Sequence, residues 1–247
     1  MKQIKWIVFT AAIALLTPAC FIDVDDDDGF FGGNCISGEG ETISQQLDVS
    51  DFDGIELDLA AKVVLRQGNE FEVIAEGKEN VIDRLDLDVR NGIWEIDTDR
   101  CIRSLNGLTI YITMPEVKVL RIAGSGEIYG ENTLITGDLE LDISGSGDMD
   151  LVVESDDIQA DISGSGKLIL SGLADEVDYD ISGSGDIRAF GLECNRADVS
   201  ISGSGDVEVF VLEFLKVRIS GSGDVFYKGN PSLDISISGS GDVIDAN

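Results

Sequence analysis

Acidic residues recur at one fixed position of a repeated Gly-Ser-Gly sequence. The residue after the second glycine is, in turn, Glu127, Asp148, Lys167, Asp186, Asp206, Asp224 and Asp242. If the copies stack, these side chains form a column spaced about 5 Å apart, in which like charges repel. Because Ca²⁺ prefers carboxylate and other oxygen ligands, one interpretation is a calcium site at Asp148, Asp186, Asp206, Asp224 and Asp242. In the alternative, each aspartate accepts a backbone N–H at its turn, and solvent screens the charges.

The cysteines predict a structural disulfide. Cys35, Cys101 and Cys194 form no Cys-x-x-Cys pair, so thiolate metal sites and thioredoxin-like chemistry have no support. In an oxidising compartment, a Cys35–Cys101 bridge would close a loop of about 65 residues and stabilise the fold by about 4 kcal/mol in the chain-entropy model. Cys194 would then be a solitary thiol.

Composition excludes several classes of function. The 247 residues include no histidine, which excludes Ser-His-Asp and Cys-His nucleophile systems, His-ligated zinc and proximal-His haem. The net charge of −31 argues against nucleic acid as a partner. Apart from Ca²⁺, no cofactor is expected. A carbohydrate-active enzyme is the alternative to a binding protein, but among 48 acids some pair always has catalytic spacing, so no catalytic residue can be named. A groove holding clustered acids beside a basic residue would favour the enzyme.

Aromatic side chains give a second candidate surface. Phe190, Phe210 and Phe226 occur in consecutive repeats at polar-phase positions, so one interpretation is an exposed strip that binds a partner. Burial under the connecting segments is the alternative. Trp94 is a further candidate contact residue, whereas Tyr227 has the apolar phase and is expected in the core.

The repeat predicts the elements that position these residues. Gly-Ser-Gly occurs seven times, with steps of 21, 19, 19, 20, 18 and 18 residues between first glycines. Apolar and polar residues alternate before each copy, as in Leu139-x-Leu141-x-Ile143, which is typical of half-buried strands. Because apolar residues recur at one phase in every copy, the pattern favours an all-β parallel β-helix, or β-solenoid, with about 18–21 residues per coil. A flat antiparallel meander is the alternative.

Residues 35–247 are predicted to form one elongated domain. Residues 119–247 contain the regular Gly-Ser-Gly coils, and residues 35–118 repeat the strand pattern in degenerate form. One helical turn is expected within residues 79–85. A separate small β domain over 35–118 is the alternative.

The N-terminal residues predict export and lipid anchoring. Lys2 and Lys5 precede an apolar stretch of about ten residues, too short to span a bilayer. Residues 1–19 resemble a bacterial lipoprotein signal peptide, after which Cys20 carries the lipid; ordinary secretion is the alternative. The acidic run in residues 20–34 predicts a solvated tether, and it resembles the surface-export signal of Bacteroidetes-type lipoproteins. We therefore expect a lipid-anchored outer-membrane protein exposed at the cell surface, with a periplasm-facing anchor as the alternative.

Several motifs also carry a family resemblance. Phe52-Asp53-Gly54-Ile55, Asn91-Gly92-x-Trp94, Tyr111-Ile112-x-Met114-Pro115 and the serial Ser-Gly-Ser-Gly-Asp copies resemble the family called putative auto-transporter adhesin, head GIN domain. The resemblance implies a β-helix-like fold on an exported protein but transfers no binding residues.

The sequence therefore predicts a non-catalytic structural or adhesion-type binding module. It is held at the membrane by its lipid and recognises a surface glycan or protein of unknown identity. An envelope carbohydrate-active enzyme and a divalent-cation-binding surface protein are the alternatives. The oligomeric state does not follow from the sequence.

Overall fold

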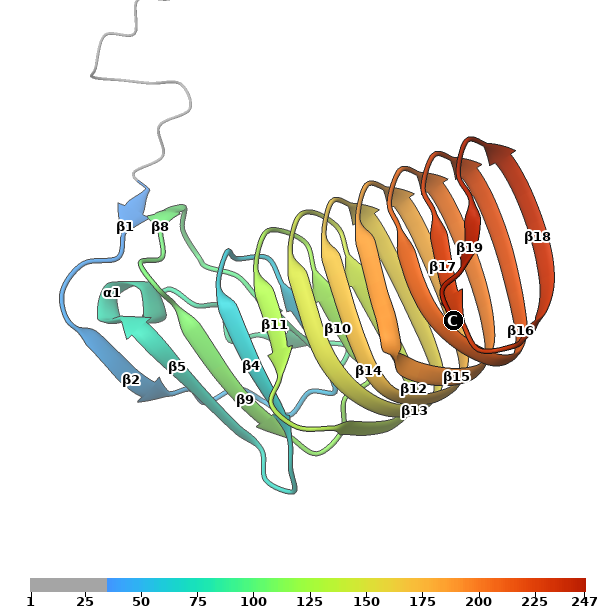
Figure 1. Ribbon diagram of the computed structural model, residues 1–247. Helices are drawn as coiled ribbons and strands as arrows, with labels where there is room; N and C mark the ends of the chain where they lie inside the picture. Colours follow the sequence, from blue (N-terminus) through green and yellow to red (C-terminus); the bar gives the residue numbers. More distant parts are fainter. Residues whose placement is uncertain (1–34) are drawn as a thin grey trace, which may run out of the picture. The chain divides into compact units, whose positions relative to one another are not determined.

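Residues 35–247, which the computed structural model describes, form one compact unit around a continuous apolar core (Figure 1). The unit is nearly all β and winds as a solenoid of about seven turns, which confirms the predicted fold class. A compact unit with its own core has what a domain needs to fold by itself. The predicted signal peptide 1–19, lipid site Cys20 and tether 20–34 lie outside the described residues. None of the helices in residues 35–247 has the length and apolar character that crossing a bilayer requires.

The regular coils are made of long strands that bend around the solenoid. They are β10 (Val119–Ile122), β11 (Glu127–Gly130), β12 (Leu134–Ile143), β13 (Asp148–Gly164), β14 (Lys167–Gly183), β15 (Asp186–Gly203), β16 (Val207–Gly221), β17 (Val225–Lys228), β18 (Ser232–Gly239) and β19 (Val243–Asp245). Each pairs in parallel with the strand one coil away, so that Ile162, Ile181, Ile201 and Ile219 lie in one register. The antiparallel meander is therefore wrong for these coils.

The alternating apolar residues fill the interior of the solenoid. Leu139, Ile158, Val177, Ala197 and Leu215 occupy one register position in successive coils, and all are buried. Burying one large aliphatic side chain contributes about 1.5–3 kcal/mol before conformational entropy is subtracted. Each coil buries its row against the rows on both sides, so the core depends on stacking.

Glycine is required where each coil turns. The first glycine of the later Gly-Ser-Gly copies, for example Gly203, has a φ of +151°, which disfavours other residues. A Cβ at Gly203 would also collide with the carbonyl oxygen of Gly183 in the coil beneath. The following serine continues the stacking, because the N–H of Ser204 donates to the Gly183 oxygen at 2.8 Å.

The N-terminal part contains two irregular coils. Its elements are β1 (Ile36–Ser37), β2 (Thr42–Gln46), β3 (Gly54–Leu57), β4 (Lys62–Gln67), β5 (Glu72–Lys78), α1 (Glu79–Ile82), β6 (Val89–Arg90), β7 (Ile93–Ile96), β8 (Ile102–Ser104) and β9 (Thr109–Met114). The coils do not follow chain order: β3 lies between β7 and β10, and β4 lies between β9 and β11, in parallel pairings. These coils thus continue the solenoid's sheet.

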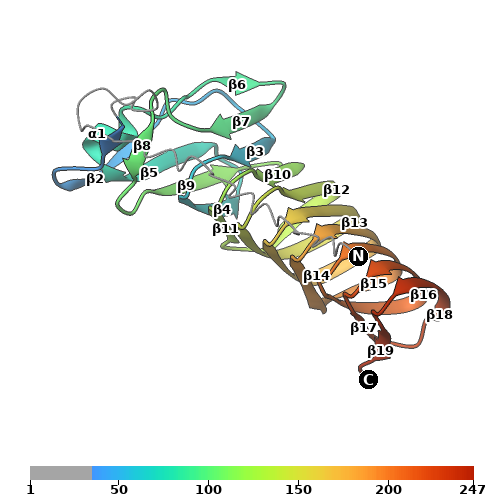
Figure 2. The same ribbon diagram turned by 90° about the horizontal axis from the view of Figure 1, so that it is seen from above.

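Antiparallel elements cover this end of the solenoid (Figure 2). Strand β5 pairs antiparallel with β9 and with β2, and β6 pairs antiparallel with β7. Helix α1, shorter than the predicted turn, buries Val81 and Ile82 against the core. A disulfide joins Cys35 to Cys101, the pair expected from the sequence, beside the parallel pair β1–β8.

Candidate functional site

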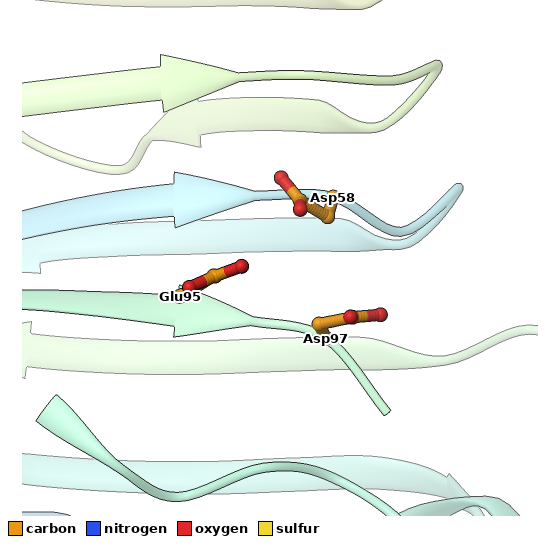
Figure 3. A group of neighbouring side chains, drawn as sticks. All are labelled: Asp58, Glu95 and Asp97. Carbon is orange, nitrogen blue, oxygen red and sulfur yellow. The ribbon is translucent and has the colours of Figure 1, made fainter. Parts of the chain in front are cut away.

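A cluster of three carboxylates lies where β3 and β7 end (Figure 3). Asp58 directly follows β3, Glu95 belongs to β7, and Asp97 directly follows β7. The parallel register places Glu56 beside Glu95, so the residues at the ends of both strands lie side by side. One oxygen from each of Asp58, Glu95 and Asp97 lies within 4.8 Å of the other two.

The charge of this cluster is only partly compensated. Arg90 reaches Glu95 at 3.6 Å, whereas Asp58 and Asp97 have no ion-pair partner within residues 35–247. Burial raises the pKa of Asp58, and the neighbouring charges of Glu56, Glu95 and Asp97 raise it further. Its Oδ1 is inaccessible and accepts no hydrogen bond from a described residue. The cluster therefore favours a proton or a cation at Asp58.

A cleft of about 860 Å³ opens beside the cluster. Asp58 and Asp97 line the cleft together with residues 100–107, which the disulfide holds at Cys101. Arg100 and Arg103 also line the cleft. Three carboxylates would supply part of the six to eight oxygens that Ca²⁺ takes, and the polar walls suit a small hydroxylated or charged group.

Sequence reasoning missed these residues, although a signal was present. Glu56-Leu57-Asp58 and Glu95-Ile96-Asp97 are the same three-residue pattern, acidic, apolar, aspartate, at the same position of two coils. The pattern lacks Gly-Ser-Gly, and the prediction relied on that motif to mark equivalent positions.

Three of the five corner aspartates that were the calcium candidates, Asp186, Asp206 and Asp224, accept a backbone N–H from the next coil. The N–H of Asp224 donates to Oδ1 of Asp206 at 2.9 Å, and the N–H of Asp242 donates to Oδ1 of Asp224 at 2.8 Å. The hydrogen bond from the N–H of Asp206 to Oδ1 of Asp186 is longer, at 3.4 Å. Lys167 separates Asp148 from Asp186 in the register. Within residues 35–247, no three of these carboxylates converge as the Asp58 cluster does.

The three phenylalanines of the predicted strip lie half-buried and do not form one column. Phe210 pairs with Lys228, whereas Phe226 pairs with Glu208, two residues away along the strand. The register between β15 and β16 shifts after Ala189, because the coils differ in length. Lys228 Nζ lies 4.2 Å from the ring centroid of Phe190, in cation–π range. The continuous exposed strip is therefore wrong.

Of the other two aromatic residues considered, the prediction for Trp94 is wrong and that for Tyr227 is confirmed. Trp94 is fully buried and donates its indole N–H to the Asp86 oxygen at 2.9 Å, so it is no surface contact residue. Tyr227 is partly buried and packs against the core, as its phase predicted.

A second polar surface runs along several regular coils. A shallow groove of about 380 Å³ is lined on one side by a row of serines: Ser163, Ser182, Ser202, Ser220 and Ser238. The neighbouring row is Asp161, Asp180, Ser200, Arg218 and Ser236. Successive coils are about 4.8 Å apart, so the groove offers hydrogen-bonding groups at a regular spacing. Such a row suits an extended, hydroxyl-rich chain.

These features define the class of the protein. It is a parallel β-solenoid with one disulfide, and rows of polar side chains run along its regular coils. The sequence family "putative auto-transporter adhesin, head GIN domain" matches residues 51–231, and the chain belongs to this family. No protein of curated function matches the sequence.

Solved structures share the fold. A putative adhesin from Bacteroides fragilis has a TM-score of 0.80 at 23% identity, covering 84% of this chain and 98% of its own. A putative lipid binding protein from Parabacteroides distasonis has a TM-score of 0.73 at 23% identity, covering 85% and 99%. A putative adhesin from the same organism has a TM-score of 0.72 at 25% identity, covering 85% and 99%.

Proposed function

We propose that the protein is a non-catalytic binding module, displayed on the outer membrane by a lipid on Cys20, that recognises a surface glycan or protein. Family membership supports an adhesion-type role and an exported location. The signal-like residues 1–19 and the acidic run after Cys20 support lipid anchoring and surface display.

The observation that carries the binding role is the serine-lined groove over the regular coils. Its hydroxyl groups, with Asp161, Asp180 and Arg218 in the neighbouring row, can donate and accept hydrogen bonds along an extended glycan. Burial raises the pKa of Asp161, against a hydrogen bond from Gln159, and the charge of Asp180 raises it further. The acidic surroundings disfavour anionic chains, so a neutral or amino-bearing glycan is the best fit.

A binding array tests this role. Purified residues 35–247 are applied to immobilised glycans and matrix proteins, beside a Ser182→Asp, Ser202→Asp variant that adds charge to the groove. The exposed Leu173→Asp variant is the control for added charge. We expect a neutral or amino-bearing glycan to bind wild type and the control but not the groove variant. Equal binding by all three would place recognition elsewhere.

Two measurements in cells test the lipid anchor and the exposure of the protein at the cell surface. Mass spectrometry of the mature protein should find acyl groups on Cys20, and Cys20→Ser should release the protein from the membrane fraction. Protease added to intact cells should digest the wild type. Protection from protease would favour the periplasm-facing anchor.

A carbohydrate-active enzyme is the second candidate function, and one feature of the cleft favours it. It places Asp58, whose pKa is raised by burial, and Asp97 beside Arg100 and Arg103. Incubating residues 35–247 with neutral and acidic oligosaccharides, followed by mass spectrometry of the products, tests it. Turnover that Asp58→Asn and Asp97→Asn each abolish would support the enzyme; no product would leave the binding module.

A further inference from the structure

The two ends of the solenoid are finished differently. At one end, β5 and β2 continue the sheet as antiparallel strands, and α1 covers the core. At the other end, β18 pairs with β16 and β19 pairs with β17, and no strand within residues 35–247 pairs with their far sides. Figures 1 and 2 show β18 and β19 as the last coil, far from β1 and β2. Repeat proteins ordinarily close such an end with a polar cap.

The open coil keeps an interior-type row of side chains. Leu233, Ile235 and Ile237 are 43%, 41% and 42% exposed, while Leu215, Val217 and Ile219, their partners in β16, are 0%, 0% and 2% exposed. The apolar row is not replaced by polar residues in the last coil of residues 35–247. An exposed edge strand of this kind is a template for another strand.

We infer that this edge pairs with the same edge of a second copy, so that two β18 strands join antiparallel about a two-fold axis through Ile235. This register places Leu233 opposite the partner's Ile237 and Ile235 opposite the partner's Ile235. On the outer face, Asp234 lies opposite the partner's Ser236, so a carboxylate faces a hydroxyl and no like charges meet along β18. The edge is therefore self-complementary in apolar character and in charge.

The structure of the covered end indicates which part of a second copy pairs with β18. Strand β2 at the covered end also has an unpaired edge within residues 35–247, but its exposed side chains, Thr42, Ser44 and Gln46, are polar. The apolar row of β18 is therefore matched by the same row of a second copy. Two identical ends related by a two-fold axis form a closed dimer and cannot extend into a filament. The pairing continues the core across the axis in the way that coil already stacks on coil.

The arrangement has a consequence that rests on the proposed lipid anchor. Residue Cys35, where the described chain begins, lies at the covered end with β1 and β8. In the dimer, the two covered ends therefore lie at opposite extremes. Copies anchored through Cys20 on different cells could meet through β18, which makes another copy of this chain the partner of the adhesin.

Sedimentation of purified residues 35–247 tests the dimer. We expect a concentration-dependent monomer–dimer equilibrium that Ile235→Asp weakens at least tenfold and Ile235→Ala weakens less. Leu173→Asp, which adds the same charge at an exposed site far from β18, should leave the equilibrium unchanged. Circular dichroism confirms that each variant folds. Because each copy is strongly acidic, the wild-type dimer should tighten as NaCl is raised. A wild type that stays monomeric at high concentration and high salt overturns the inference.

Oxidative crosslinking tests the register separately. Ile235→Cys should crosslink to itself in dimers, because opposed residues in an antiparallel pair lie close enough for a disulfide. Leu233→Cys and Ile237→Cys should crosslink when the two variants are mixed, and neither should crosslink alone. Dimers in which Leu233→Cys crosslinks to itself would contradict the register.

A bead assay separates the dimer from the proposed function. Beads that carry residues 35–247 through their N-termini should aggregate, and Ile235→Asp beads should not. Dimers without surface display in cells would overturn the anchor proposal and leave the dimer standing. Surface display and glycan binding without aggregation of beads would overturn pairing between cells and leave the binding module standing.

Discussion

The backbone N–H of Asp224 donates a 2.9 Å hydrogen bond to Oδ1 of Asp206, the aspartate at the same corner one coil away. The carboxylate therefore links consecutive coils, which explains an acidic column without requiring a metal. A hydrogen bond of this kind contributes about 0.5–1.5 kcal/mol net, and somewhat more when the acceptor is charged.

Substitutions at Asp206 test this link. Asp206→Ala removes the acceptor and should lower the free energy of unfolding by about 1 kcal/mol. Asp206→Asn keeps an acceptor oxygen and relieves repulsion, so it should be neutral or stabilising. Chemical denaturation measures both. Millimolar Ca²⁺ should not change the midpoint of the wild type; a Ca²⁺-dependent rise that Asp206→Asn abolishes would restore the calcium interpretation.

A methyl group added at a corner glycine should destabilise the fold far more than a methyl group added at a glycine within a strand. Gly203→Ala combines a φ of +151° with a collision against the Gly183 carbonyl, so we expect a loss of about 3 kcal/mol or more. Gly137→Ala is the matched control, because its Cβ would meet nothing nearer than 3.8 Å. Thermal melts of the two variants should differ clearly, and equal melts would mean that the corners adjust freely.

The carboxylate cluster predicts how stability depends on pH. The folded state raises the pKa of Asp58 above 3.8, so the folded state binds this proton more tightly than the unfolded state does. The stability from that proton is present below pH 3.8 and is lost as pH rises through the folded pKa. Asp58→Asn should remove this loss and raise stability at neutral pH by less than about 1 kcal/mol, because solvent screens the cluster. The exposed Asp51→Asn serves as control, and denaturation from pH 4 to 8 measures the difference.

Tyr179 offers a test of the core. Its side chain is fully buried, its hydroxyl has no hydrogen-bond partner within residues 35–247, and burial raises its pKa well above the ordinary value. Removing an unpartnered polar group while keeping the ring should be neutral or stabilising, by up to about 1 kcal/mol for Tyr179→Phe. Tyr179→Ala should cost about 3–5 kcal/mol through the cavity it leaves. A destabilised Tyr179→Phe would show that the hydroxyl has a partner in solution.

The cysteines predict a graded alkylation pattern for residues 35–247. Burial raises the pKa of the Cys194 thiol to about 12, so the native protein should take up no iodoacetamide at neutral pH. Unfolding without reductant should expose one thiol, and unfolding with reductant should expose three. Reduction should also destabilise the covered end by about 4 kcal/mol in the chain-entropy model. Mass spectrometry counts the adducts; three adducts without reductant would exclude the disulfide.

Much of this structure follows from the sequence because the interactions of a solenoid are nearly local. Each regular coil contacts only the coils beside it, so the period of the Gly-Ser-Gly corners and the alternation of residues such as Ile162 and Ile181 carry the fold. The family match and the parallel ladders confirm that interpretation. The phenylalanine column failed where coil length varied, since the register shift after Ala189 pairs Phe210 with Glu193 and not with Phe190.

Tertiary structure alone decided the order of the coils and the position of the carboxylate cluster. Alternation along β3 and β7 reports which residues face inward, but it does not report which coil lies next to which. The chain places β3 between β7 and β10, and this brings Asp58 against Glu95 and Asp97, which are distant in sequence. The repeated pattern of acidic residue, apolar residue and aspartate marks equivalent positions in two coils, but it does not show that these coils are neighbours, because packing across a long sequence separation decides which coils stack.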